Sequence, residues 1–210
     1  MNSLIIDTST KFLYIALVKE DTVLSEKIFE GSKNHAGNSV YQINEMLNEH
    51  NLKASDIDNV YCGYGPGSYT GVRISVTIAK MLASFGNINL YKISSLFLAG
   101  SGYDNKNVAV MFDARRGNSF SACYGETIIE DKLRSNEEFL EMVNTLDDII
   151  VVNESNYKVN LLKVISAGIK VNDVEAFVPN YLRITEAEYN LRNQKWLEEL
   201  MWVMQLILQH

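Results

Sequence analysis

The sequence predicts an α/β fold with two halves of the same order, in which three strands precede a helix, a strand and a second helix. Three observations predict it. Short runs rich in Ile, Leu, Val and Tyr open the chain and are separated by tight polar turns, which is typical of antiparallel strands. Segments with apolar residues at helical spacing then alternate with further apolar runs. The same succession starts again after the polar loop "GSGYDNKN".

The first half is expected to begin as a meander and to continue with helices and strands in alternation. The turns "TSTK" and "KED" separate the first three strands, and a glycine-rich turn joins the fourth strand to the second helix. Gly86 is placed to end that helix. The expected strands are residues 4–7, 12–19, 22–29, 57–64 and 89–93, and the expected helices are residues 38–49, 72–86 and 95–99.

The second half is expected to have the same order on a smaller scale. Its expected strands are residues 108–113, 119–124, 127–130 and 149–152, and its expected helices are residues 136–144 and 157–167. After Arg192 the apolar residues fall on one wide helical face, which suits packing on its own domain or pairing with another subunit. We therefore expect an N-terminal domain over residues 1–103, a C-terminal domain over residues 104–190 and an amphipathic helix over residues 191–210.

The charge of the chain argues against direct binding to nucleic acid or to an anionic membrane. It carries 26 acidic and 19 basic side chains, which give a net charge of -7. It holds no run of the roughly 18 apolar residues that span a bilayer and no signal-peptide pattern at its start. We expect a cytoplasmic protein that does not contact a membrane, with buried free thiols at Cys62 and Cys123.

The histidines do not predict a metal site. His35, His50 and His210 are not spaced as a pair of ligands on one helix, and no HExxH occurs. A peptidase is not predicted either, because no spacing of Ser, His and Asp supports one.

The glycine-rich turn "CGYGPGSYTGVRIS" raises the question of a phosphate site, because helix-start N–H groups attract anions. It lacks the lysine of a P-loop, and its glycines do not fit GxGxxG. Gly65 and Gly67 permit positive φ, Pro66 restricts the chain, and Ser68 or Thr70 can cap the helix. A rigid elbow and a contact with a ligand or partner are equally favoured, and the residues concerned are Gly65, Pro66, Gly67, Ser68, Thr70, Gly71 and Arg73.

The turn "DTST" is the second candidate for ligand contact. Asp7 could orient a metal-bound water or a phosphate, and the hydroxyls of Thr8, Ser9 and Thr10 could bind phosphate oxygens. These residue types also form turns without any ligand, and this second interpretation is favoured about two to one on turn chemistry.

Four blocks, "IIDTST", "YGPGSYTGVRIS", "DARRGNSF" and "VPNYLR", resemble in their order the TsaB family, also called YeaZ. The block from Gly65 to Arg73 is the most specific of them. The resemblance implies an actin-like fold of the sugar kinase and heat-shock ATPase superfamily, duplicated, with a reduced second half. It also implies a non-catalytic subunit of the bacterial tRNA threonylcarbamoyladenosine machinery. Such a subunit binds and activates TsaD, which transfers threonylcarbamoyl to adenosine 37 next to the tRNA anticodon, together with the ATPase TsaE.

The resemblance also implies what this chain lacks. Catalytic TsaD relatives carry a metal-binding HxxxH helix where this chain reads "YKISSLFLAG", and Ser94, Ser95 and Leu98 do not replace the histidines. No catalytic residue, metal or cofactor of its own is therefore expected. A nucleotide at the interface with a partner would be the exception, near Asp7, Thr8 and the elbow.

In relatives the two helices beside the elbow pair with those of TsaD, or of a second copy, as a four-helix bundle. Here these are residues 38–49 and 69–85. The interface residues expected on them are Tyr41, Met46, Val72, Val76, Ala79, Lys80 and Ala83. Contact with tRNA would then be indirect, through the complex.

Two departures from the family weaken any nucleotide contact by the second half, namely Asn118 in place of a glutamate and "VVNESNY" in place of a glycine turn. The alternative function is a small ATP-dependent kinase of the actin-like superfamily with Asp7 as its base. It would need a second phosphate loop, which the sequence does not offer.

Overall fold

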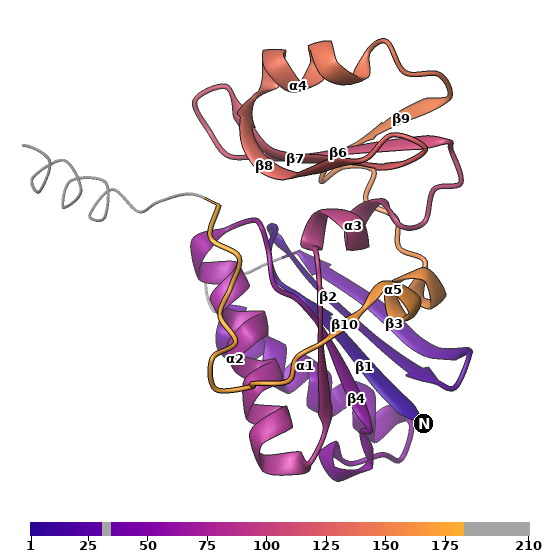
Figure 1. The fold of residues 1–210 in the computed structure, drawn as a ribbon. Coiled ribbons are helices and arrows are strands. Elements are labelled where there is room, and N and C mark those ends of the chain that lie inside the picture. The colour runs from indigo at the N-terminus through magenta and orange to yellow at the C-terminus, as the bar shows by residue number, and fades with distance from the viewer. Residues whose placement is uncertain (31–34, 183–210) are drawn as a thin grey trace, which may run out of the picture.

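The computed structural model describes residues 1–30 and 35–182, which form two β-sheets with helices around and between them (Figure 1). The six-stranded sheet has the order β10-β5-β4-β1-β2-β3 and the four-stranded sheet the order β8-β7-β6-β9. The strands of the first sheet are β1 (Asn2–Asp7), β2 (Phe12–Lys19), β3 (Thr22–Glu30), β4 (Asn59–Gly63), β5 (Asn89–Ile93) and β10 (Ile169–Lys170). Those of the second are β6 (Asn107–Asp113), β7 (Asn118–Gly125), β8 (Ile129–Ser135) and β9 (Ile149–Val152).

The two sheets share the pairing of their first four strands. In the first sheet β1 is antiparallel to β2 and parallel to β4, and β3 is antiparallel to β2. In the second sheet β6 is antiparallel to β7 and parallel to β9, and β8 is antiparallel to β7. The strands predicted from apolar runs are therefore all present.

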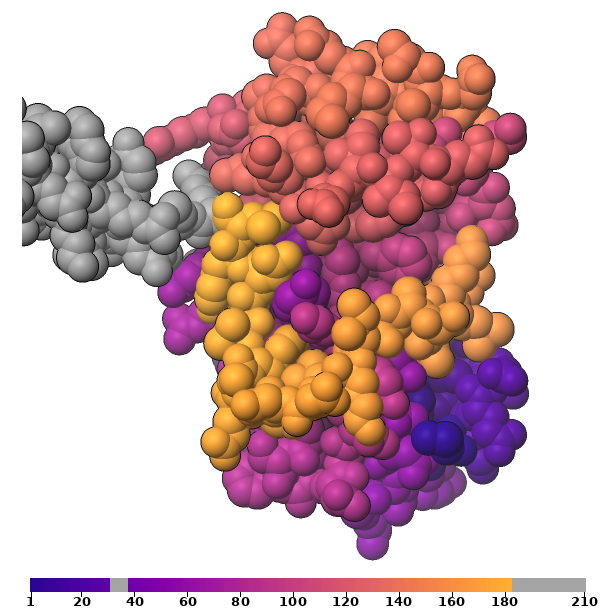
Figure 2. Space-filling view, in the orientation of Figure 1, coloured from indigo at the N-terminus to yellow at the C-terminus, as the bar shows by residue number. Residues whose placement is uncertain are grey.

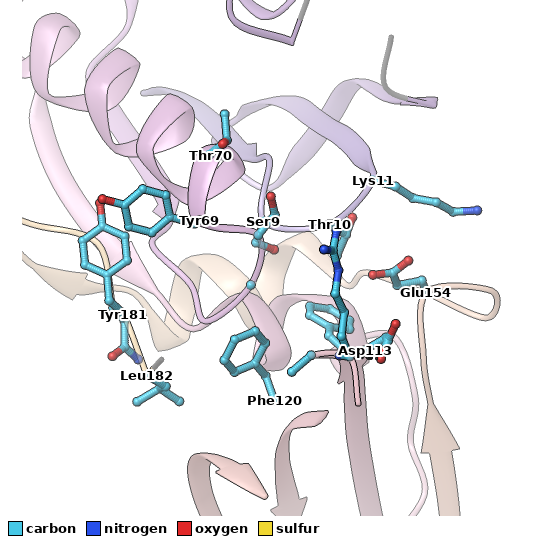
Figure 3. A pocket seen from close by; sticks show the side chains of 16 residues that line it. Ser9, Thr10, Lys11, Tyr69, Thr70, Asp113, Phe120, Glu154, Tyr181 and Leu182 are labelled. Carbon is cyan, nitrogen blue, oxygen red and sulfur yellow. Dashed lines mark hydrogen bonds between the residues drawn. The ribbon is translucent and has the colours of Figure 1, made fainter. Parts of the chain in front are cut away.

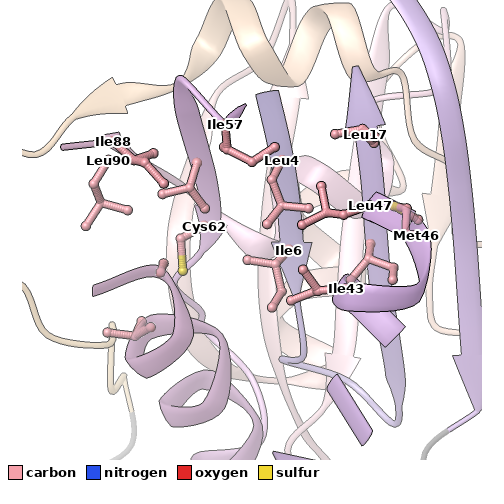
Figure 4. Close-up of a cluster of buried hydrophobic side chains, with 14 of the residues drawn as sticks. Leu4, Ile6, Leu17, Ile43, Met46, Leu47, Ile57, Cys62, Ile88 and Leu90 are labelled. Carbon is pink, nitrogen blue, oxygen red and sulfur yellow. The ribbon is translucent and has the colours of Figure 1, made fainter. Parts of the chain in front are cut away.

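Helices α1 (His35–Glu49) and α2 (Tyr69–Gly86) cover one face of the six-stranded sheet. Leu4 and Ile6 of β1 point toward them and join one core cluster, whereas Ile5 belongs to the cluster on the opposite face. This alternation follows from the two-residue period of a strand. Figure 4 shows Ile43, Met46 and other side chains of α1 packed on the sheet.

Helices α3 (Ser95–Gly100), α4 (Asn136–Val143) and α5 (Leu161–Ala167) lie on the other side of the first sheet or around the second. The single-turn η1 (Ala54–Asp56) precedes β4 and contacts α2. Helix α3 joins the two sheets, because Leu98 packs with the first and Leu96 with the second. Helix α4 packs on the second sheet through Phe139 and Val143.

After β9 the chain returns to the first sheet, which the sequence-based domain boundaries do not anticipate. Leu161 and Val164 of α5 pack with Ile5 of β1, and β10 pairs with β5. Residues 171–182, here called the strap, then run beside α2 toward the second sheet (Figures 1 and 2). The predicted domain of residues 104–190 thus includes a segment that packs against the first sheet, since the apolar side of α5 finds its partners there.

The first or last residues of several helices and strands differ from those expected from apolar spacing, because local hydrogen bonds set these ends. Helix α2 starts at Tyr69, three residues before the apolar spacing begins and as the range implied by the resemblance has it, because the Ser68 hydroxyl accepts a hydrogen bond from the Gly71 N–H at 3.4 Å. Helix α5 starts at Leu161 rather than 157 because Asn160 caps it through the Lys163 N–H. Strand β8 extends to Ser135, beyond the expected residue 130, and the two-residue β10 is not predicted at all. The expected helix over residues 191–210 lies outside the described residues.

Candidate functional site

The elbow between β4 and α2 is packed on the turn between β1 and β2. The Ser68 N–H donates to the Ser9 carbonyl at 2.6 Å. The Thr8 hydroxyl donates to the Gly71 carbonyl at 2.7 Å and accepts from the Ser75 N–H at 3.1 Å. Three hydrogen bonds therefore join the two candidate phosphate loops to each other.

The glycines of the elbow make this close packing possible. A Cβ atom on Gly67 would overlap the Ser9 backbone, and one on Gly71 would overlap the Thr8 carbonyl. Only Gly65 has the positive φ that the sequence suggests for two positions, at +106°, followed by a cis bond to Pro66. Gly67 is required for space, not for its φ.

Asp7 lies beneath the elbow and is almost fully buried. Its side chain is 2% exposed, its Oδ1 accepts from the Ser9 N–H at 2.7 Å, and a Cβ on Gly63 would overlap its carboxyl group. Burial raises the pKa of this carboxyl above its ordinary value, although the nearby polar groups of Ser9 and Ser95 oppose the rise. The arrangement favours a structural role.

A cleft of about 630 Å³ opens between the two sheets, beside the elbow (Figure 3). One wall comes from the β1–β2 turn and the start of α2, and the other from the end of β6 and the loop after β9. The strap closes a third side. The lining residues are Ser9, Thr10, Lys11, Gly67, Ser68, Tyr69, Thr70, Phe112, Asp113, Ala114, Arg115, Phe120, Glu154, Asn180, Tyr181 and Leu182.

Of the eleven elbow and turn residues expected near a ligand, five line this cleft, namely Ser9, Thr10, Gly67, Ser68 and Thr70. Those that do not are Asp7, Thr8, Gly65, Pro66, Gly71 and Arg73. Sequence reasoning missed Lys11 and Glu154. The block "DARRGNSF" could have pointed to Asp113 and Arg115, but no local signal marks Glu154.

Arg73 lies over the Tyr69 ring at the start of α2, and that ring packs against Tyr181. Its guanidinium carbon is 5.5 Å from the centre of the Tyr69 ring, and the Tyr69 and Tyr181 rings are 5.0 Å apart. The positive charge near the helix start is thus placed over an aromatic face, which attracts cations.

Most of the expected partner-interface residues are buried. Exposure is 0% for Met46, 1% for Val72, 3% for Val76 and 0% for Ala79, because the apolar stripe of each helix faces the sheet. These four side chains therefore do not form a surface of the single chain.

The other three expected interface residues lie nearer the surface. Ala83 is half-buried, and the Lys80 ammonium donates to the Glu175 and Phe177 carbonyls of the strap at 2.7 and 3.0 Å. Tyr41 is 57% exposed. The other large exposed apolar side chains on these two helices are Val40, Tyr69, Met81 and Phe85.

Comparison with known proteins identifies the family. A family model described as "TsaD: tRNA N6-adenosine threonylcarbamoyltransferase" matches residues 22–178. The tRNA threonylcarbamoyladenosine biosynthesis protein TsaB of Bacillus subtilis is 32% identical over 231 aligned positions, which cover 94% of this chain and 99% of that protein. The chain belongs to the TsaB family. The TsaB of Escherichia coli is 33% identical over 59% of this chain and 55% of its own length.

The fold agrees with that of solved TsaB-like structures. YeaZ from Pseudomonas aeruginosa covers 86% of this chain and 99% of its own, with a TM-score of 0.67 and 21% identity. A second structure from that organism, described as similar to the peptidase YEAZ, has a TM-score of 0.70 with 20% identity over 87% of this chain and 99% of its own. The resemblance expected from the four sequence blocks is confirmed.

In this TsaB-family chain, the segment "YKISSLFLAG", where an HxxxH helix is expected in TsaD relatives, takes part in a hydrogen-bonded cluster with the second sheet. Ser94 and Tyr124 donate to the two oxygens of the Asp131 carboxylate at 2.5 and 2.6 Å. Burial and the nearby Asp131 charge raise the pKa of Tyr124 well above its ordinary value. The cluster ties β5 and α3 to the second sheet. Within residues 1–30 and 35–182, no group of His, Cys, Asp and Glu could hold a metal ion.

The described part of the chain also bears on two other expectations. Cys62 and Cys123 are free and buried, as predicted. Among the helices described, none combines the length and the apolar character needed to cross a bilayer.

Proposed function

We propose that the chain is a non-catalytic subunit of the bacterial tRNA threonylcarbamoyladenosine machinery. It binds TsaD and supports transfer of the threonylcarbamoyl group to the adenosine next to the anticodon, in the cytoplasm and together with TsaE. The observation that carries this proposal is the match along 94% of the chain to a protein named for that biosynthesis. The shared pairing of the two sheets supports the duplicated actin-like architecture.

The outer side of α1 and α2 is the surface proposed for TsaD. Val40 and Tyr41 are both 57% exposed, Met81 is 55% exposed and Phe85 is 86% exposed. Covering an exposed Phe or Met side chain contributes about 1.5–3 kcal/mol, so several on one interface can hold two proteins together.

The same side could pair two copies of this chain when TsaD is absent. A nucleotide, where one takes part, would lie at the shared interface, and tRNA would be held mainly by TsaD.

An accessory role fits the chemistry of the described residues better than the alternative kinase. A kinase base must reach the hydroxyl proton of its substrate. Asp7 is buried under the elbow and does not line the cleft. The hydroxyl of Thr8 is already used by α2.

Reconstitution with TsaD, TsaE, tRNA, threonine, bicarbonate and ATP, with the enzyme that forms the threonylcarbamoyl-adenylate, tests the proposal. We expect modification to fall to background when this chain is omitted. Phe85→Glu should abolish co-purification with TsaD and modification, because a carboxylate would be buried at the interface. Ile128→Glu is the matched control, since Ile128 is 77% exposed near the second sheet. Full modification without the chain would overturn the proposal.

A further inference from the structure

The cleft between the sheets has two chemically different ends. Lys11, Asp113 and Glu154 lie at one end in Figure 3, and Tyr69 and Tyr181 lie at the other, with the Phe120 ring between them. Its volume of about 630 Å³ falls within the range of small-molecule sites, about 300–1,000 Å³. The shape and the lining suit a ligand with one charged end and one apolar end.

The charged end holds groups of both signs that the described chain leaves available. The Arg115 guanidinium and the Glu154 carboxyl make no hydrogen bond or ion pair with any residue in the described ranges, whereas Lys11 pairs with Glu30 at 3.4 Å. Glu154 is half-buried, and burial raises the pKa of its carboxyl while Lys11 partly opposes the rise. A half-buried carboxyl group is better solvated by a cationic partner than by an apolar wall.

The balance of charges argues against a nucleoside polyphosphate in this cleft. Two cationic side chains, Lys11 and Arg115, face two carboxyl groups, Asp113 and Glu154. Several phosphate charges would therefore meet as much repulsion as attraction. A ligand with one negative and one positive group fits this balance.

The start of α2 adds a place for the negative group. Ser68, Tyr69 and Thr70 line the cleft, and the first turn of this 18-residue helix has the positive end of the helix dipole. The positive end of the α2 dipole and the Arg115 guanidinium would both attract a single carboxylate placed between them.

We propose that the cleft binds a small zwitterion of the α-amino-acid class with an apolar or aromatic side chain. Its carboxylate faces Arg115 and the start of α2, its ammonium group faces Glu154, and its side chain lies against Phe120 and Tyr69. The site needs only this chain, so it holds or fails independently of any complex with TsaD.

Isothermal titration of the full chain with L-phenylalanine and L-leucine tests the proposal. We expect saturable binding of at least one of them, and none of its N-acetyl methylamide, which keeps the side chain but lacks both charges. Glycine should bind at least tenfold more weakly, because it lacks the apolar group. Equal binding of the zwitterion and the neutral derivative, or no binding of either amino acid at millimolar concentration, would overturn the proposal.

Variants locate the binding within the chain. Arg115→Gln and Glu154→Gln should each weaken binding by about tenfold or more, as expected for loss of a hydrogen bond to a charged group. Arg116→Gln and Glu126→Gln are the matched controls, since neither residue lines the cleft, and both should bind as the parent does. Binding that is unchanged in both cleft variants would place the ligand elsewhere and contradict the proposal.

Discussion

The elbow before α2 and the turn between β6 and β7 both reach the cleft, and glycine has a different task in each. In the elbow, Gly67 and Gly71 leave no room for a Cβ atom, because the β1–β2 turn lies against them. In the β6–β7 turn, Gly117 has a φ of +74° and open space around it. Tertiary packing fixes the first turn, whereas local backbone conformation decides the residue in the second. Substitutions of these glycines should therefore differ in how much unfolding free energy they cost. They should also differ in whether a residue that tolerates positive φ recovers the loss.

Gly71→Ala is expected to have the largest effect. Its Cβ would collide with the Thr8 carbonyl, so either α2 or the β1–β2 turn must move, at about 3 kcal/mol of unfolding free energy. Urea denaturation measures the change, with Ser84→Ala on the exposed side of α2 as control. A loss as small as that of the control would mean that the elbow is not held by this contact.

Thr8→Val tests the same junction without adding bulk. The change removes two hydrogen bonds in a buried place, with the Gly71 carbonyl and the Ser75 N–H, which should cost about 2 kcal/mol at roughly 1 kcal/mol each. Thr77→Val, at an exposed position of α2, is the control and should change unfolding free energy little. If both variants unfold at the same urea concentration, the Thr8 hydroxyl does not secure α2.

Gly117→Ala should cost about 1 kcal/mol, from the left-handed conformation alone. Gly117→Asn should recover most of that loss, because asparagine tolerates this conformation better. The same pair of changes at Gly71 should show no recovery, since the larger side chain worsens the overlap. Thermal unfolding of the four variants makes the comparison, and recovery at Gly71 would contradict it.

Asp7→Asn should have the smallest effect, and its size should depend on pH. Burial raises the pKa of Asp7 above its ordinary value of 3.8, so the folded protein keeps the proton where the unfolded chain releases it. This residue's contribution to stability is therefore full below that value and is lost as the pH rises through the raised pKa. Asparagine carries no charge, so the variant should gain stability relative to the parent toward neutral pH, and less so near pH 4.

Urea denaturation from pH 4 to pH 8 checks this sign. A variant that loses stability relative to the parent as the pH rises would mean that the Asp7 carboxylate, not the acid, is the favoured form in the folded protein. In the reconstituted tRNA reaction, Asp7→Asn should remain active, whereas a kinase that uses Asp7 as its base would not.

Much of the fold could be predicted because its signals are local. The apolar runs of β1 and β2 and the helical spacing in α2 are visible in neighbouring residues, and so is Ser68 as a helix cap. The two-residue β10 carries no such pattern, because its place depends on β5, far away in the sequence. The helix faces were misassigned for a related reason. An apolar stripe such as Val72, Val76 and Ala79 looks the same whether it meets a sheet or a partner.

The sequence by itself determined the order of the elements before β10 and the family, since these follow from local chemistry and from motifs that are contiguous in the chain. Only the tertiary structure decided that Asp7 and Thr8 are buried against the elbow, and that the strap returns to α2. It also decided which side chains meet in the cleft. Lys11, Arg115 and Glu154 come from three separate turns, and the folding of two sheets toward each other is what brings their charges to one place.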